Sequence, residues 1–162
     1  MNKVFAAVLL ATALAAIEGT IVSTAIPSIT SDLSGAELIS WIYSAYLLTS
    51  AIAAIIFGKL ADLFGRKRMI MIGISIFLLG SLLCGIATSM EMLIIFRAIQ
   101  GIGAGSILPI TLTIVGELFE TEKKRAKGQG YISMVWGVAG VVGPLIGGFI
   151  VDQLTWHFIF LL

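Results

Sequence analysis

Long apolar runs separated by short polar links dominate the pattern along this 162-residue chain. Five runs hold 19 to 24 residues each and cover 4–26, 39–57, 69–89, 92–115 and 130–151, and a sixth, 156–162, reaches the end of the chain. A bilayer core of about 30 Å needs about 20 helical residues, whereas a membrane strand needs only about 10 residues of alternating character. The pattern therefore predicts an all-α membrane protein: a helical bundle with five transmembrane helices plus the start of a sixth.

Composition excludes several other classes of protein. Apolar residues make up 59% of the chain and charged residues only 12%, about half of the roughly 25% typical of soluble domains. Disorder would require low hydrophobicity and high charge, and Cys84, the single cysteine, has no partner for an internal disulfide. No metal-binding cluster, nucleophile–base set or phosphate loop is visible in the sequence. We therefore expect no enzyme, and no cofactor.

Basic residues are concentrated on one side of the predicted membrane. Nine of the ten precede the first run or lie in the second and fourth links: Lys3, Lys59, Arg66, Lys67, Arg68, Lys123, Lys124, Arg125 and Lys127. The positive-inside rule places these segments, and with them the N-terminus, in the cytoplasm. We expect a multi-pass protein of the cell membrane, in a bacterium the cytoplasmic membrane. Trp41 and Trp156 then fall at the outer interface, where aromatic belts lie.

The first 16 residues permit a second interpretation. One lysine, an apolar run and several Ala-x-Ala triplets also fit a cleavable secretory signal peptide. The apolar character continues past Glu18 to residue 26, however, and four further runs follow. This continuation favours an uncleaved first span.

Two charges, Glu18 and Arg97, lie inside the predicted spans. Each costs at least about 2.5–3.5 kcal/mol on insertion scales when it lies near mid-membrane. Counting about 1.5 Å per residue from the ends of the runs puts both about 8–9 Å below the outer surface of a core of about 30 Å. The two side chains could therefore meet if their helices adjoin. They predict a proton or cation site, with a fixed packing salt bridge as the alternative.

The link after the second run reads GKLADLFGRKR, from Gly58 to Arg68. A basic orientation anchor explains its charges but not an aspartate and two glycines at these spacings. The pattern G-x-x-x-D-x-x-G-R-K-R after a second span resembles the signature loop of the major facilitator superfamily. The sequence departs from that loop at Leu63, where many members carry arginine, and the departure affects one ion pair of the loop.

Three further motifs support the resemblance. The run from Arg97 to Ala104 is similar to the R-x-x-Q-G-x-G-A pattern of the fourth helix in this superfamily, and Gly101 and Gly105 form a G-x-x-x-G that permits close backbone approach. The sequence from Glu18 to Pro27 is similar to a first-helix motif of the 14-span drug exporters, in which aspartate is the commoner acid. The glycines around Pro144 resemble the fifth-helix motif of drug:proton antiporters, with Ala139 in place of one further glycine.

The resemblance implies the N-terminal half of the major facilitator fold, in a secondary transporter that alternates access between two six-helix halves around a midplane substrate site. It implies proton-coupled export of lipophilic or cationic drugs, with the proton gradient as the energy source. The implied partners are the lipid bilayer, protons, a small-molecule substrate and the missing C-terminal half of the same transporter. Basic residues in short clusters without a basic face argue against nucleic acid.

The motifs assign roles to three groups of residues. Proton and substrate handling is expected of Glu18, Arg97, Gln100 and Tyr46. A conformational gate is expected of Gly58, Asp62, Gly65, Arg66 and Arg68. Bending and sealing of the fifth helix is expected of Gly130, Gly143, Pro144, Gly147 and Gly148. Tyr43, Tyr46 and Trp136 could line a substrate pocket or serve only as packing residues.

Two alternatives remain open from the sequence. A symporter or facilitator for another small solute is one, although the glycine-rich motif at 143–148 argues against it. The other follows from the end of the chain inside an apolar run, which also allows a truncated remnant without transport activity. Cys84 is expected to be a small apolar filler, and His157 a solvated interfacial residue.

Overall fold

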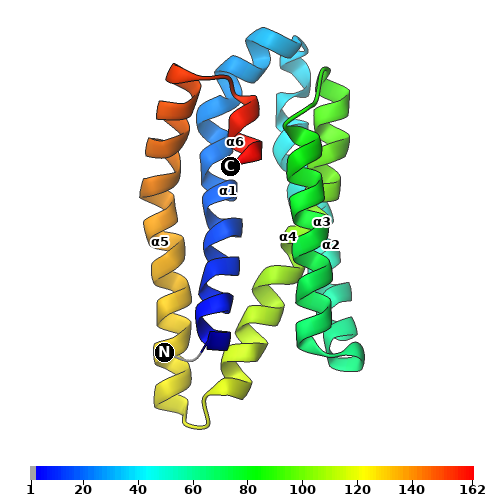
Figure 1. Cartoon of the computed structure of the whole chain (residues 1–162). Helices are drawn as coiled ribbons and strands as arrows, with labels where there is room; N and C mark the ends of the chain where they lie inside the picture. Colours follow the sequence, from blue (N-terminus) through cyan, green and yellow to red (C-terminus); the bar gives the residue numbers. More distant parts are fainter. Residues whose placement is uncertain (1–2) are drawn as a thin grey trace.

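The computed structural model describes residues 3–162, which form a bundle of long helices (Figure 1). The five long helices are α1 (Lys3–Leu33), α2 (Ile39–Phe64), α3 (Arg66–Cys84), α4 (Met90–Leu118) and α5 (Glu122–Gln153). A short 3-10 turn (Ala36–Leu38) precedes α2, and α6 (His157–Leu161) follows α5. All five long helices are long and apolar enough to cross a membrane. The described residues hold no strand, so the predicted fold class is confirmed.

The helices extend beyond most of the apolar runs that predicted them. Hydropathy marks the lipid-facing length of about 20 residues, whereas the helical backbone hydrogen bonds continue into polar sequence. α1 therefore runs on through Pro27, and α5 begins eight residues before the apolar run that starts at residue 130. The third run behaves differently, because α3 ends at Cys84 and residues 85–89 form the turn into α4. The interpretation of the first residues as a signal peptide also includes Met1 and Asn2, which lie outside the described residues.

The segment expected to be a loop between the second and third spans is almost entirely helical. Gly58 to Phe64 form the last turns of α2, and Arg66 already belongs to α3. Only Gly65 separates the two helices, with φ of 95°. This positive φ is strained for residues with a side chain, so glycine is required for the abrupt turn.

α4 lies between α2 and α3 and contacts both through its glycines. A Cβ at Gly101 would overlap the Tyr46 carbonyl of α2, and one at Gly103 would overlap the backbone of Phe77 in α3. Gly105 packs in the same way against the Ser50 carbonyl of α2. The close backbone approach expected from the G-x-x-x-G pattern is therefore present. It fixes the depth of Arg97, which begins this glycine-rich stretch.

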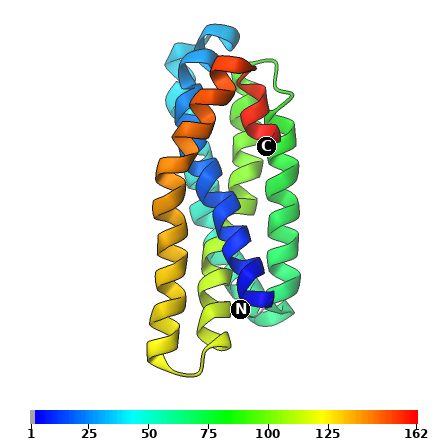
Figure 2. The same ribbon diagram turned by 60° about the vertical axis from the view of Figure 1, so that its left-hand side comes forward.

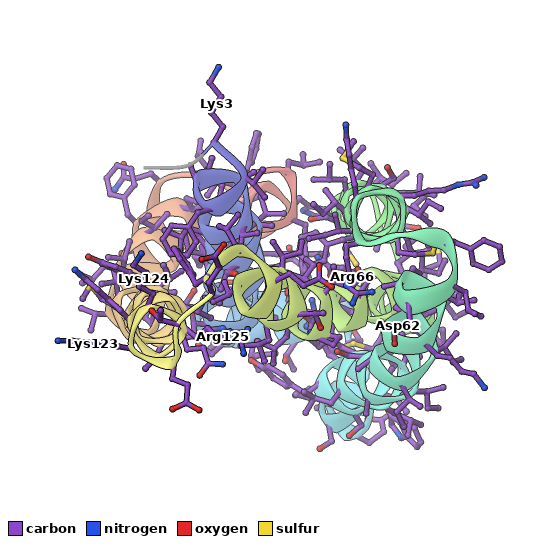
Figure 3. All side chains as sticks on the ribbon, turned by 90° about the horizontal axis from the view of Figure 1, so that it is seen from below. Lys3, Asp62, Arg66, Lys123, Lys124 and Arg125 are labelled. Atoms are coloured by element: carbon purple, nitrogen blue, oxygen red, sulfur yellow. The ribbon has the colours of Figure 1, made fainter. Side chains whose placement is uncertain are left out.

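α1 packs along α5 on the other side of the bundle, and α6 descends beside α1 and α3 (Figures 1 and 2). The start of α1, the α2–α3 turn and the α4–α5 link lie at the same end, which we call the basic end. Figure 3 shows Lys3, Arg66, Lys123, Lys124 and Arg125 there. The one-sided distribution of basic residues inferred from the sequence is thus a feature of the folded bundle.

The two tryptophans expected in an outer aromatic belt differ in their surroundings. Trp41 is 53% exposed at the end opposite the basic end, as the belt would require. Trp156 is only 1% exposed, and its indole N–H donates to Asp32 at 2.8 Å. Trp156 therefore lies near the expected end of the bundle but is not a lipid-facing belt residue, because its side chain packs inside the bundle and joins the start of α6 to the end of α1.

Candidate functional site

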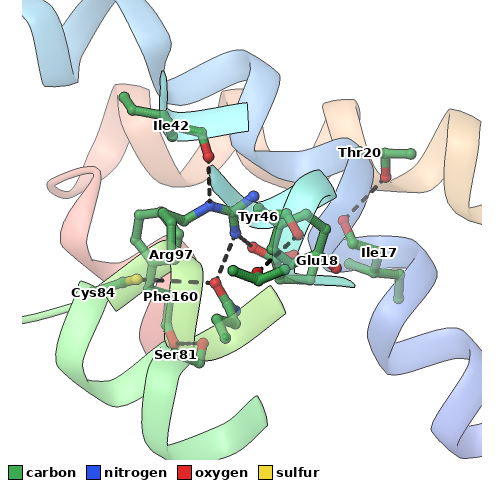
Figure 4. A network of polar contacts seen from close by, with 11 residues as sticks. Ile17, Glu18, Thr20, Ile42, Tyr46, Ser81, Cys84, Arg97 and Phe160 are labelled. Atoms are coloured by element: carbon green, nitrogen blue, oxygen red, sulfur yellow. Dashed lines mark hydrogen bonds and ion pairs between the residues drawn. The ribbon is translucent and has the colours of Figure 1, made fainter. Parts of the chain in front are cut away.

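Glu18 of α1 and Arg97 of α4 form an ion pair inside the bundle (Figure 4). Glu18 is 7% exposed and Arg97 is 1% exposed. Arg97 Nη1 donates to Glu18 Oε1. Small residues on the buried face of α1, Ala11 and Ala15, leave room for α4 to approach. The two charges, expected at similar depths, thus lie on helices that meet.

Several elements hold the Arg97 guanidinium in place. Nη1 also donates to Gln100 Oε1 at 2.7 Å, and Nε donates to the Ile42 carbonyl at 3.4 Å. Its guanidinium carbon lies 4.1 Å from the centroid of the Tyr46 ring, in a cation–π contact, and 5.9 Å from that of Phe160. A cation in a low-dielectric interior is tolerated only with such compensation. Tyr46 and Gln100, both named from the sequence, thus belong to this cluster.

Two buried polar atoms of the cluster have no hydrogen-bond partner among the described residues. They are Oε2 of Glu18 and Nε2 of Gln100. Buried polar groups are satisfied in the great majority of structures, so each of these two atoms has the capacity for one further hydrogen bond. Glu18 can bind a proton on Oε2 while Oε1 stays on Arg97.

Two cavities flank the ion pair. One of about 200 Å³ lies between α1, α3 and α6 and is lined by Glu18, Ser81 and Phe160 among apolar neighbours. The other, of about 150 Å³, lies between α1, α2, α4 and α5, and its lining includes Tyr46 and Trp136. Of the three aromatic residues suggested as pocket-lining, Tyr43 is not part of this second cavity. Neither Glu18 nor Arg97 lines it either.

The gate residues meet at the basic end around Arg66. Arg66 donates to Asp62 Oδ1 and to Glu117 Oε1, each at 2.6 Å, and to the Ala61 carbonyl at 3.1 Å. The end of α2, the start of α3 and the end of α4 are thereby joined. Glu117 is a functional candidate that sequence reasoning missed. Its signal was a carboxylate two residues after the fourth apolar run, the first of three acidic residues in that link.

The other expected gate residues play different parts. Gly65 makes the turn described above. Gly58 lies within α2, and a Cβ there would meet nothing within 4 Å among the described residues. Arg68 is exposed at the basic end.

The structure divides the antiporter-like motif of α5 into two faces. Gly143 and Gly147 pack against α1, where a Cβ at either would overlap Thr20 or Thr24. Gly130 and Gly148 face open space. Pro144 is half-buried, and α5 continues through it to Gln153. The motif therefore supplies one close contact with α1 and one open face.

Cys84 and His157, for which the sequence signals were weaker, both make specific contacts in the structure. Cys84 is fully buried, as expected of an apolar filler, and its sulfur lies 3.9 Å from Gln100 Oε1. His157 stacks on Trp156 with ring centroids 3.7 Å apart, and its Nε2 lies 3.3 Å from the Ala87 carbonyl. A fully solvated histidine is therefore not what the structure shows.

The family model described as Major Facilitator Superfamily matches residues 8–162. This chain belongs to the major facilitator superfamily. It is 50% identical over 145 residues to "Multidrug transporter protein MdtP" of Bacillus subtilis, covering 90% of this chain and 27% of that protein. "Multidrug resistance protein 3" of the same organism is 45% identical over 152 residues, covering 94% of this chain and 30% of that protein.

A further relative is named an efflux pump. "Efflux pump dotC" of Dothistroma septosporum is 40% identical over 157 residues, covering 97% of this chain and 27% of that protein. The chain thus spans 27 to 30% of the length of these relatives. With its long apolar helices it is a multi-pass membrane protein of a transporter family whose similar members are named multidrug transporters and efflux pumps.

Proposed function

We propose that this chain forms the N-terminal helices of a proton-coupled exporter of lipophilic or cationic drugs. The observation that carries the proposal is the buried Glu18–Arg97 pair with its unpartnered Glu18 Oε2. Intramembrane ionisable residues in transporters mark proton and substrate pathways. The names of the relatives support drugs as the substrate class.

The proton step takes place at Glu18. A proton entering from outside binds Oε2 and neutralises the carboxylate, which weakens its hold on Arg97. Rearrangement of the helices then releases the proton to the cytoplasm while a drug molecule moves outward. One pH unit of gradient supplies about 1.4 kcal/mol, and 100 mV supplies about 2.3 kcal/mol per net charge moved.

The basic end is proposed to face the cytoplasm, in a bacterial cytoplasmic membrane. This orientation rests on the basic residues gathered there, since cytoplasmic segments are enriched in Lys and Arg. The Asp62–Arg66–Glu117 cluster then lies at the cytoplasmic gate. Because this cluster joins α2, α3 and α4, it can stabilise one arrangement of these helices relative to another.

Transport in inside-out vesicles tests the proposal. The full-length transporter that carries this segment is compared with its Glu18→Gln variant, with ethidium as the drug probe and a proton gradient as the only driving force. We expect gradient-driven uptake to be lost in Glu18→Gln. It should be retained in Glu37→Gln, which removes an exposed carboxylate at the end of the bundle opposite the basic end. Undiminished pH-driven uptake by Glu18→Gln would refute the proposal.

Counterflow without a pH gradient is the companion measurement. Exchange of labelled for unlabelled ethidium needs drug binding and helix movement but no net proton flux. Glu18→Gln is expected to retain counterflow, which separates a lost proton step from a misfolded transporter. A facilitator for another solute would show no proton-driven ethidium uptake even in the parent protein.

A further inference from the structure

Tyr46 stands between the ion pair and the cavity of about 150 Å³. One side of its ring contacts the Arg97 guanidinium, 4.1 Å from the centroid, and Tyr46 also lines the cavity. Glu18 and Arg97 are absent from the cavity lining, and Arg97 is 1% exposed. A ligand in the cavity therefore touches Tyr46 but reaches neither charge.

The cavity lining is chemically simple. It consists of apolar, aromatic and hydroxyl side chains: Thr12, Ala15, Tyr46, Leu47, Ser50, Ala104, Ile107, Leu108 and Trp136. No carboxylate is among them. A lipophilic ligand placed there finds aromatic faces at Tyr46 and Trp136 but no negative charge from these helices.

We propose that Tyr46 is a positioning residue that couples ligand binding in this cavity to proton binding at Glu18. A ligand in the cavity holds the Tyr46 ring against the Arg97 guanidinium. Arg97 then stays paired with Glu18, and this pairing opposes protonation of the Glu18 carboxylate. Protonation of Glu18 frees Arg97, and Tyr46 then loses its support and moves into the cavity. The cavity ligand and the proton on Glu18 thus weaken each other's binding without direct contact. By thermodynamic linkage, each lowers the affinity for the other by the same factor. The inference rests on the proposed proton role of Glu18.

The other titratable groups around Glu18 do not link the ion pair to this cavity. Tyr43 of α2 and Cys84 of α3 interact with Glu18 and Arg97 electrostatically, but neither lines the cavity. α5 packs along α1 and has no titratable residue between Tyr131 and Asp152. On α6 the titratable residue is His157, which lies at the far end of the helix against Ala87. Of these neighbours, Tyr46 alone is shared by the charges and the cavity.

Infrared spectroscopy of the carboxyl band tests the coupling directly. The full-length transporter carrying this segment is reconstituted in vesicles, and the protonated carboxyl band of Glu18 is identified by its loss in Glu18→Gln. At a pH where Glu18 is half-protonated, saturating ethidium is added. We expect the ratio of protonated to ionised Glu18 to fall by about fivefold or more in the parent, within the usual range of site–site coupling.

Three variants decide whether Tyr46 carries this effect. Tyr46→Ala is expected to reduce the ethidium-induced change to less than about twofold on that scale. Tyr46→Phe keeps the ring beside Arg97 and loses only the hydroxyl, which interacts with Glu18, so it is expected to retain most of the change. Tyr43→Ala removes a ring from the same helix outside the cavity and is also expected to retain it.

The outcomes separate this inference from the proposed function. An undiminished change in Tyr46→Ala, or a loss that Tyr43→Ala shows equally, overturns the role of Tyr46. The same holds if saturating ethidium leaves the Glu18 band of the parent unchanged. Retained pH-driven uptake in Glu18→Gln overturns the proton role of Glu18 itself, whatever the Tyr46 variants do.

Discussion

Gly143 of α5 lies directly against Thr20 of α1: a Cβ added to Gly143 would overlap Thr20 Oγ1 and come within 3.1 Å of Thr20 Cβ. The same Thr20 hydroxyl donates to the Ala139 carbonyl of α5 at 2.9 Å. Gly143, which has no side chain, lets the two helices approach closely. The Thr20 hydroxyl then forms a hydrogen bond between α1 and α5. Small residues and interhelical hydrogen bonds are the usual means of helix association in membranes.

Gly143→Ala is therefore expected to destabilise the bundle by about 1–3 kcal/mol, the usual cost of overpacking. Gly148→Ala on the same helix is the matched control, because a Cβ there meets nothing within 4 Å. It is expected to be neutral or stabilising by up to about 1 kcal/mol through helix propensity. Unfolding of the purified protein in detergent–SDS mixtures, followed by circular dichroism, measures both.

A double variant identifies the contact responsible. Thr20→Ala removes the oxygen that the new Cβ would overlap, so Gly143→Ala should cost less in that background than alone. Equal stabilities for Gly143→Ala and Gly148→Ala would show that the contact between α1 and α5 is not tight at this point.

Replacement of the ion pair by apolar residues gives a second test. Arg97→Leu leaves Glu18 unpaired, and Glu18→Leu leaves Arg97 unpaired, so each single variant is expected to lose about 3–5 kcal/mol of stability. Glu18→Leu with Arg97→Leu removes both charges and should recover most of that loss, because the burial penalty disappears with them. The same SDS titration supplies the three values. If the losses of the single variants simply added in the double variant, the two charges would not be paired in the folded protein.

Much of the fold could be predicted from the sequence because lipid imposes a length on each span. The shared depth of Glu18 and Arg97 was also predictable, since both lie at countable positions along helices of known rise. The one-sided basic end followed from counting Lys and Arg in alternate links. Lengths, depths and charge counts needed no knowledge of which helices are neighbours, whereas the contact between Glu18 and Arg97 did.

What the sequence could not predict was the rotation of each helix about its own axis. A small-residue stripe at helical spacing does not say which of its members face α1, so the division of the motif between Gly143 and Gly148 became visible only in the structure. Glu117 was missed for the same reason, because its partner Arg66 belongs to another helix. The burial of Trp156 depended on where α6 turns back into the bundle.

Asp62→Asn is expected to shift the balance between inward-open and outward-open forms of the transporter while changing drug affinity little. Asp62 binds one nitrogen of Arg66, whose other terminal nitrogen binds Glu117, so loss of its charge loosens the connection among α2, α3 and α4. Accessibility labelling of single cysteines at the two membrane faces measures the shift. Glu120→Gln removes an exposed carboxylate at the same end and is the control. An unchanged labelling pattern in Asp62→Asn, or an equal change in Glu120→Gln, would rule out a gating role for Asp62.

The hydrogen bond from Trp156 to Asp32 gives the last prediction. Trp156 is 1% exposed and its indole N–H donates to an Asp32 carboxylate oxygen at 2.8 Å. Hydrogen bonds to charged groups contribute about 1.5–3 kcal/mol, and solvent screening lowers this because Asp32 is exposed, so Trp156→Phe should destabilise the bundle by about 1 kcal/mol or more. Trp41→Phe replaces a tryptophan that is 53% exposed and should change stability by less than about 0.5 kcal/mol.

Trp156→Phe also shortens a buried ring, so the hydrogen bond must be separated from packing. Asp32→Ala removes the acceptor while leaving the ring in place, and a double-mutant cycle then isolates the pairwise term. We expect a coupling of about 1 kcal/mol or more between the two substitutions, since each removes the same bond. Independent effects in the cycle would mean that the ring of Trp156 stabilises the bundle through burial alone, and that α6 is held to α1 by packing rather than by Asp32.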